Sequence, residues 1–184
     1  MTIGVLAVQG NFREHAAMLR SLGADVVEVR LPEQLDGLDG LVIPGGESTA
    51  IMRLMRLYGL EQAIRRFTAP VFGTCAGMIL LDRSHLGLID VEVERNSYGR
   101  QLASFEADLE LEDETEPLRG VFIRAPRVAE IGADVEVLAS HDGVPVLLRD
   151  GRFLVASFHP ELTGDTRVHE QFLELVREES GVRA

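Results

Sequence analysis

The segment PVFGTCAGMILL, residues 70–81, places a short apolar strand, a Gly-x-Cys-x-Gly turn and an apolar helix pattern in direct succession. This order is typical of a nucleophile elbow, here with sulfur in place of a serine oxygen. Gly73 and Gly77 flank Cys75 where a strained turn and close strand–helix packing leave no room for side chains. At a helix N-terminus, free N–H groups and the helix dipole favour the thiolate. An arbitrary lone cysteine is usually a small buried hydrophobic residue, but these features favour a nucleophile.

A nucleophilic thiol needs a base, and the segment FLVASFHPE, residues 153–161, supplies one. The pattern predicts a strand that ends at His159, with Pro160 keeping the backbone extended. Side chains two residues apart on an extended segment point to the same side, so Glu161 would lie beside the His159 ring and orient it. We therefore predict a Cys-His-Glu triad. The remaining histidines fall in predicted helices, a loop and a turn, where we expect structural or solvated roles: His15, His169, His85 and His141.

A third segment, LDGLVIPGGEST at residues 38–49, predicts a buried strand that leads into a Gly-Gly turn. Backbone N–H groups at Gly45 and Gly46 would face a developing oxyanion there, and Ser48 would cap the helix that follows. By itself, the turn is better interpreted as a plain connection between strand and helix. With a thiol nucleophile in the same sheet, the two interpretations become equally good.

Alternating strand and helix patterns in the first half predict a doubly wound sheet with sites at the carboxyl ends of its strands. Asn11 would cap the first helix, with Glu14 in capping-box position. The strands are expected at residues 3–8, 26–30, 40–43 and 70–73. In the second half, Asp-Gly pairs separate three apolar runs and predict an antiparallel meander, at residues 135–139, 144–148 and 153–158. The predicted fold class is thus a three-layer, doubly wound α/β mixed sheet, flavodoxin-like, with residues 1–184 as one domain.

The amino-acid composition excludes several classes of binding partner and cofactor. The net charge of −12, from 18 basic and 30 acidic residues, argues against nucleic acid or an anionic membrane as a partner. One cysteine excludes an internal disulfide, and no Cys/His cluster has zinc spacing, so no metal or cofactor is expected. No apolar run approaches the ~20 residues of a membrane span, and the N-terminus lacks the pattern of a signal peptide. We expect a cytoplasmic protein, in which the thiol stays reduced.

Six motifs along nearly the whole chain resemble the class I (triad) glutamine amidotransferases. More closely, they resemble the family of glutaminase subunits of pyridoxal 5'-phosphate synthase, the PdxT family. The Gly-Gly loop, the elbow and the His-x-Glu pair specify the superfamily, whereas the ERNSYGR and FIRAP runs point to the narrower family. The motifs are IGVLAVQG (3–10), PGGEST (44–49), FGTCAG (72–77), VERNSYGRQ (93–101), GVFIRAP (120–126) and SFHPELT (157–163).

The resemblance implies hydrolysis of L-glutamine, with Cys75 as nucleophile, His159 as general base and acid, and Glu161 as the orienting carboxylate. We expect backbone N–H groups near Gly46 and Ala76 to hold the oxyanion. The resemblance further implies that ammonia passes to a synthase subunit of the PdxS type in a hetero-oligomer. It implies a glutamine pocket lined by Gly46, Glu47, Ser48, Arg95, Ile123 and Arg124.

An amino-acid substrate brings an α-carboxylate, so its pocket needs a cation. Taken alone, Arg95, Arg100 and Arg124 would each be read as surface charges. With the resemblance, Arg95 becomes the strongest carboxylate ligand and Arg100 the weakest candidate.

Two other functions stay open at this point. One is a different amidotransferase, which would feed ammonia to an enzyme of a histidine, purine or folate pathway. The other is a non-catalytic α/β protein that uses Cys75 as a redox sensor. Such a sensor would need no His159–Glu161 pair, so a glutaminase assay with excess synthase separates it from an enzyme.

Overall fold

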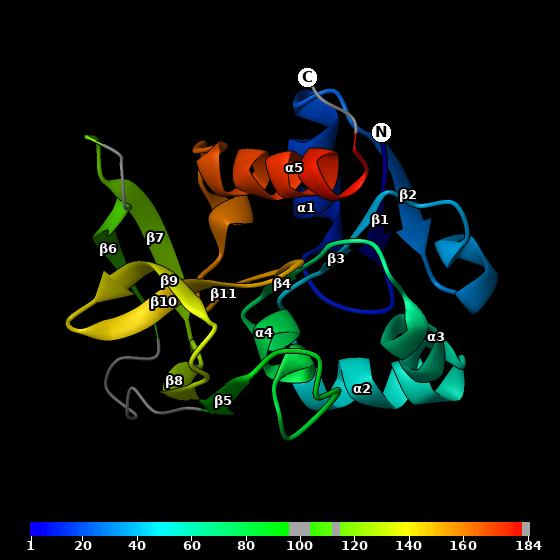
Figure 1. Cartoon of the computed structure of the whole chain (residues 1–184), viewed down its shortest axis with the longest axis horizontal. Helices are drawn as coiled ribbons and strands as arrows, with labels where there is room; N and C mark the ends of the chain where they lie inside the picture. The colour runs from blue at the N-terminus through cyan, green and yellow to red at the C-terminus, as the bar shows by residue number, and fades with distance from the viewer. Residues whose placement is uncertain (96–103, 112–114, 182–184) are drawn as a thin grey trace.

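A mixed sheet runs through the middle of the molecule, with helices on both faces (Figure 1). The computed structural model describes residues 1–95, 104–111 and 115–181. Within these residues the main sheet has nine strands, in the order β2-β1-β3-β4-β11-β10-β9-β6-β7. A separate antiparallel pair joins β5 (Val91–Glu94) to β8 (Arg127–Ile131).

The first five strands of this order are mutually parallel. Their apolar residues lie under helices on both faces, and every residue of β3, β4 and β11 is buried. The predicted doubly wound half is therefore confirmed. These strands are β2 (Asp25–Val29), β1 (Thr2–Leu6), β3 (Gly40–Ile43), β4 (Val71–Thr74) and β11 (Phe153–Ala156).

The other strands pair in antiparallel fashion: β9, β10 and β11 form the predicted meander, and β6 and β7 extend it. Asp142 and Gly143 both have positive φ, 49° and 75°, as a type I′ hairpin turn between β9 and β10 requires. Because β11 is parallel to β4 and antiparallel to β10, it joins the two halves into one sheet. These strands are β10 (Val144–Asp150), β9 (Glu136–His141), β6 (Ser104–Leu111) and β7 (Leu118–Ile123).

Two helical layers cover the sheet. On one face lie α1 (Phe12–Ser21) and α5 (Arg167–Glu179); on the other lie α2 (Ser48–Leu57), α3 (Leu60–Arg66) and α4 (Ala76–Leu81) (Figure 1). Each layer packs on its own hydrophobic cluster, so the predicted three-layer arrangement is confirmed. Among the described residues, no helix combines the length and the apolar character needed to cross a membrane.

Two helix starts differ from the sequence prediction. Asn11 is the N-cap residue of α1, but its side chain makes no capping hydrogen bond. Glu47, and not Ser48, is the N-cap residue of α2, where its carboxylate accepts from the backbone N–H groups of Thr49 and Ala50, at 3.1 and 2.7 Å. A carboxylate satisfies these free donors and also complements the helix dipole. The Asn11 side chain, which makes no capping hydrogen bond, is available for another contact.

Candidate active site

Cys75 lies in a strained turn between β4 and α4. Its backbone has φ 49° and ψ −103°, and its N–H donates to the carbonyl of Ala156 in β11 at 2.8 Å. A Cβ on Gly77 would collide with the carbonyl of Ile43, and one on Gly73 would lie 2.8 Å from the carbonyl of Gly77. Only glycine fits at both positions, so the sequence folds here into the predicted elbow.

His159 and Glu161 meet directly, with 2.7 Å between Nδ1 of the ring and Oε1 of the carboxylate. The backbone conformation that was expected to bring these two side chains together was wrong, however. Pro160–Leu162 form a 3₁₀ helix, η2, instead of an extended segment, and β11 ends at Ala156. Proline fits the first turn of such a helix because its missing N–H would have had no partner there. The tight turn folds Glu161 back toward the ring, and the N–H of His159 is held by the carbonyl of Val121 at 2.8 Å.

The pair is buried and polarised. Burial alone would lower the pKa of His159, but hydrogen bonds to Cys75 and Glu161 and the charges of both groups outweigh it and raise this pKa to about 10. Burial would raise the pKa of Glu161, but His15, His159 and Asn11 act in the opposite direction and hold it at about 2. At neutral pH the arrangement is therefore an imidazolium between a carboxylate and the sulfur. Such a ring has a proton ready for a leaving group.

Asn11 is a site residue that the sequence did not reveal. Its side-chain amide donates to Glu161 Oε1 at 3.1 Å and lies 3.4 Å from His159 Nδ1. In the sequence, an asparagine before an amphipathic helix is the usual mark of a cap, which hid this second role. The contact gives the buried Glu161 carboxylate a hydrogen-bond donor in addition to the His159 ring.

A cavity of about 400 Å³ opens at the carboxyl edge of the sheet and contains almost all the predicted site residues. Glu161 lies behind His159, outside this lining. Across the opening, Cys75 Sγ lies 3.9 Å from the carbonyl oxygen of Ile123. The cavity is lined by Gln9, Asn11, Gly46, Glu47, Ser48, Cys75, Ala76, Ile79, Arg95, Ile123, Arg124 and His159.

Hydrogen bonds hold the Gly-Gly loop on both sides of Gly46. Gly45 N–H donates to Thr74 Oγ1 at 3.1 Å, and the Gly45 carbonyl accepts from Asn11 N–H at 2.9 Å. Beyond it, Glu47 N–H donates to Gln9 Oε1 at 2.9 Å. Because one peptide plane carries its C=O and N–H in opposite directions, the Asn11 bond also fixes the direction of the Gly46 N–H. A Cβ on Gly45 would lie 3.0 Å from His159 Nδ1, so the loop packs against the ring.

Arg95 lies at the rim of the cavity, where Thr49 and His85 contact its guanidinium. Its guanidinium donates to Thr49 Oγ1 at 3.2 Å and lies 2.9 Å from His85 Nε2. The opposite nitrogen of His85 contacts the buried carboxylate of Asp82 at 2.7 Å. Arg124 has an unusual positive φ of 44°. Arg100 and the rest of the ERNSYGR run after Arg95, residues 96–100, lie outside the described residues.

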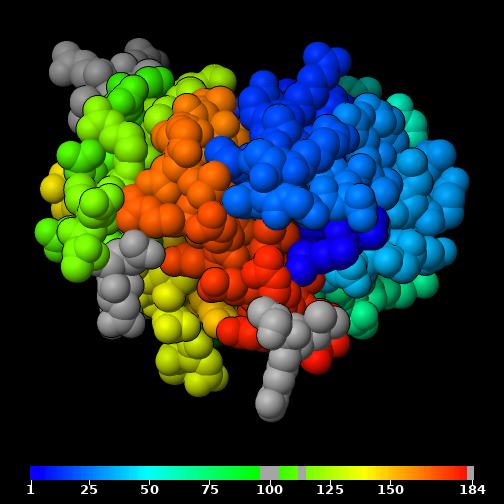
Figure 2. Space-filling model, turned by 90° about the horizontal axis from the view of Figure 1, so that it is seen from above, coloured from blue at the N-terminus to red at the C-terminus, as the bar shows by residue number. Residues whose placement is uncertain are grey.

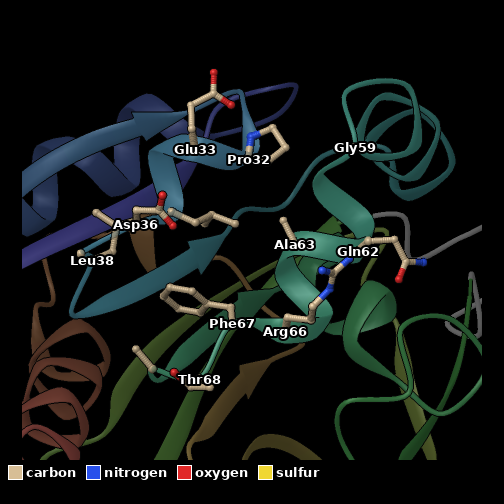
Figure 3. Close-up of a pocket in the computed structure, with 13 residues that line it drawn as sticks. Pro32, Glu33, Asp36, Leu38, Gly59, Gln62, Ala63, Arg66, Phe67 and Thr68 are labelled. Carbon is tan, nitrogen blue, oxygen red and sulfur yellow. The ribbon is translucent and has the colours of Figure 1, made fainter.

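A larger cavity of about 710 Å³ lies elsewhere, between η1 (Pro32–Leu35) and α3. Figure 3 shows Pro32 and Glu33 on one side of it and Ala63 and Phe67 on the other. Its lining includes the residues just before β3 and β4, at the sheet edge opposite Cys75. No cysteine or histidine lines it, so the smaller cavity is the candidate active site.

A cysteine elbow facing a His-x-Glu pair in a doubly wound sheet defines the glutamine amidotransferase class of proteins. Residues 5–178 match the SNO glutamine amidotransferase family, and the chain belongs to that family. A relative from Thermosipho africanus, called pyridoxal 5'-phosphate synthase subunit PdxT, is 53% identical over 96% of this chain and 100% of its own length. The PdxT subunit of Bacillus velezensis is 52% identical over 95% of this chain and 94% of its own.

Solved structures agree on the fold. A structure described as a glutamine amidotransferase has 49% sequence identity and a TM-score of 0.89, and the match covers 95% of this chain and 98% of the other. A chain of the PurLQS structure from Thermotoga maritima has 19% identity and a TM-score of 0.70, over 94% of this chain and 97% of the other. At that identity the second likeness shows the fold alone.

Proposed function

We propose that this chain is the glutaminase subunit of a pyridoxal 5'-phosphate synthase and hydrolyses L-glutamine to L-glutamate and ammonia. The observation that carries the proposal is the convergence of Cys75, His159 and Arg95 on one cavity. The names of relatives about half identical over nearly the full length support the synthase assignment. Residues 1–184 would act as one glutaminase domain, in the cytoplasm where a thiol stays reduced.

The proposed reaction begins with attack of the Cys75 thiolate on the side-chain carboxamide carbon of glutamine. Backbone N–H groups near Gly46 and Ala76 hold the tetrahedral oxyanion. His159, oriented by Glu161, gives its proton to the departing ammonia and then takes one from the water that hydrolyses the γ-glutamyl thioester. This sequence needs an imidazolium first and a neutral ring second, which fits a histidine held between sulfur and carboxylate.

The rest of the cavity would bind the amino-acid end of the substrate. Arg95 offers a cation to the α-carboxylate, while Glu47, although engaged as a helix cap, supplies negative charge for the α-ammonium. Ser48, Ile123 and Arg124 complete the lining on either side of Cys75. The geometry therefore favours a small zwitterion whose reactive amide reaches the sulfur.

Glutamate release should depend on a synthase partner of the PdxS type. Ammonia released without an acceptor wastes glutamine, and the glycine-rich loop beside Cys75 gives a docked partner a backbone segment to reorient. The test measures glutamate release at saturating glutamine, for the purified chain alone and with excess synthase. We expect a clearly higher rate with synthase. No release in either condition would reject the glutaminase assignment, and equal rates would reject activation by the partner.

Replacing Arg95 by alanine should raise KM for glutamine by roughly 10- to 100-fold and change kcat much less, because a charged hydrogen bond to the α-carboxylate is lost in ground and transition states alike. Steady-state kinetics with synthase present measure both constants. Arg83→Ala is the matched control, since Arg83 is paired with Asp90 and Glu130 and does not line the cavity. An unchanged KM for Arg95→Ala would exclude this residue as the carboxylate ligand.

A further inference from the structure

Behind the triad, two histidines from different helices form a fully buried pair. His15 of α1 and His169 of α5 are both 0% exposed, and His15 Nδ1 lies 2.9 Å from His169 Nε2. Figure 2 shows the orange and red segment that contains α5 packed against the blue N-terminal segment that contains α1. The helix patterns in the sequence predict only structural or solvated roles for both residues.

The other nitrogen of His15 faces the catalytic groups. His15 Nε2 lies 3.4 Å from Glu161 Oε2 and 3.0 Å from Thr74 Oγ1. Thr74 in turn accepts from Gly45 N–H, in the loop proposed to hold the oxyanion. His15 thus contacts both the carboxylate that orients His159 and the hydroxyl that anchors the Gly-Gly loop.

The contacts fix one arrangement of protons. A carboxylate oxygen accepts only, so the His15 nitrogen that faces Glu161 carries the proton and Nδ1 is bare. His169 Nε2 must then donate to that bare nitrogen, which leaves His169 Nδ1 as a bare acceptor. That atom is buried without a hydrogen-bond partner, which costs less for an acceptor than for an N–H donor. The reverse arrangement would turn a lone pair toward the carboxylate and bury an unpaired N–H.

Packing alone does not account for the pair. The rings do contact the core, since Phe72 lies edge-on to both, with centroids 6.0 and 5.6 Å away. An aromatic or aliphatic residue would fill this space without the cost of desolvating two imidazoles. The ring nitrogens of His15 and His169 instead form a continuous chain of polar contacts that ends at Glu161 and Thr74.

We propose that His15 is a positioning residue of the triad, which presents its Nε2–H dipole to the buried Oε2 of Glu161 at 3.4 Å while bonded to Thr74, and that His169 fixes the tautomer of His15. The inference rests on the proposed glutaminase function. Asn11 donates to Oε1, the oxygen that meets the His159 ring, while His15 Nε2 faces Oε2, a buried oxygen that has no hydrogen-bond partner among the described residues.

Charge around His15 agrees with a neutral donor. The titratable groups that act on it are Glu161 of η2, His159, His169 of α5 and Glu14 on its own helix. Burial lowers the pKa of His15 despite the nearby carboxylates, and burial with His15 beside it lowers the pKa of His169 to about 3. Both rings are therefore neutral at physiological pH, and His15 acts on Glu161 through an N–H dipole.

The test compares His15→Gln with His15→Asn, in the full chain with synthase present. Both side chains are neutral amides, but only that of glutamine reaches the position of Nε2. We expect His15→Gln to stay close to wild type, and His15→Asn to lose roughly 10- to 100-fold in kcat with little change in KM. Phe172→Leu, which removes ring volume beside Phe72 in the same layer, controls for lost stability.

A second readout does not need glutamine. The rate of Cys75 alkylation by iodoacetamide, followed against pH, reports changes of protonation in the groups around the sulfur. Without the His15 donor the pKa of Glu161 rises, so the acidic limb should move to higher pH in His15→Asn and return in His15→Gln. Because alkylation is independent of turnover, this arm decides the proposal even if wild type releases no glutamate.

Several results would overturn the proposal. One is an equal kcat for His15→Gln and His15→Asn. Another is a fall in kcat that only follows the loss of thermal stability, as in Phe172→Leu. The third is an acidic limb of the alkylation profile that does not move. Should His15→Asn not fold, His169→Leu takes its place, since it removes the donor to His15 Nδ1 and frees the tautomer. We then expect a smaller fall in kcat and the same direction of shift, and an unchanged acidic limb would equally reject the idea.

Discussion

Cys75→Ala should reduce glutamate release by roughly 10⁴-fold or more, because the chain then has no nucleophile to form the thioester. The fold should be retained. The backbone at this residue is already strained, but its position is fixed by the N–H bond to Ala156 and by the glycines on either side. Alanine is smaller than cysteine and fits the same buried space. The measurement is glutamate release with excess synthase, beside far-UV circular dichroism and thermal unfolding.

Synthase binding supplies the internal control for that result. A folded Cys75→Ala chain should bind the synthase as wild type does, because the thiol lies inside the cavity and is only 6% exposed. Loss of both binding and activity would mean that the elbow supports the partner surface as well. Appreciable hydrolysis by Cys75→Ala would contradict the thioester mechanism itself.

Most of the fold could be predicted because its signals are local. An unbroken apolar run at residues 3–8 predicts a strand covered on both faces, and Asp142-Gly143 predicts a tight hairpin turn. Both are formed in the structure. The backbone around Pro160 was predicted wrongly because proline fits an extended strand end and the first turn of a helix equally well.

The site was predictable only where one motif carries its own geometry. Gly-x-Cys-x-Gly sets the conformation of Cys75. His159 and Glu161 also meet as predicted, but through the turn of η2 and not through an extended segment. By contrast, Asn11 directly precedes α1, and His15 and His169 lie in helices whose apolar pattern predicts burial but not which polar group a buried side chain meets. Their partners lie between 59 and 154 residues away in sequence, so only the packing of α1 and α5 on the sheet reveals them.

Glu161→Gln is expected to cause the other large loss of activity. The amide keeps the shape of the side chain but removes the charge that stabilises the His159 imidazolium, and its NH₂ group competes with the ring for the role of donor. Loss of the orienting carboxylate costs about 10⁴-fold in kcat in the serine triad template. A thiol is more easily deprotonated than a serine hydroxyl, so we expect roughly 10²- to 10³-fold here, well short of Cys75→Ala.

The pH dependence distinguishes this role from simple packing. With the carboxylate gone, the pKa of His159 falls from about 10, and the alkaline limb of kcat/KM should move to lower pH. Stability should change in the acid range. The Glu161 pKa of about 2, below its ordinary 4.5, contributes stability that is present above pH 4.5 and lost as the pH falls toward 2. Glu161→Gln should therefore flatten the fall of the melting temperature across that window, and an unchanged alkaline limb together with an unchanged acid melting profile would show that the carboxylate does not act on His159.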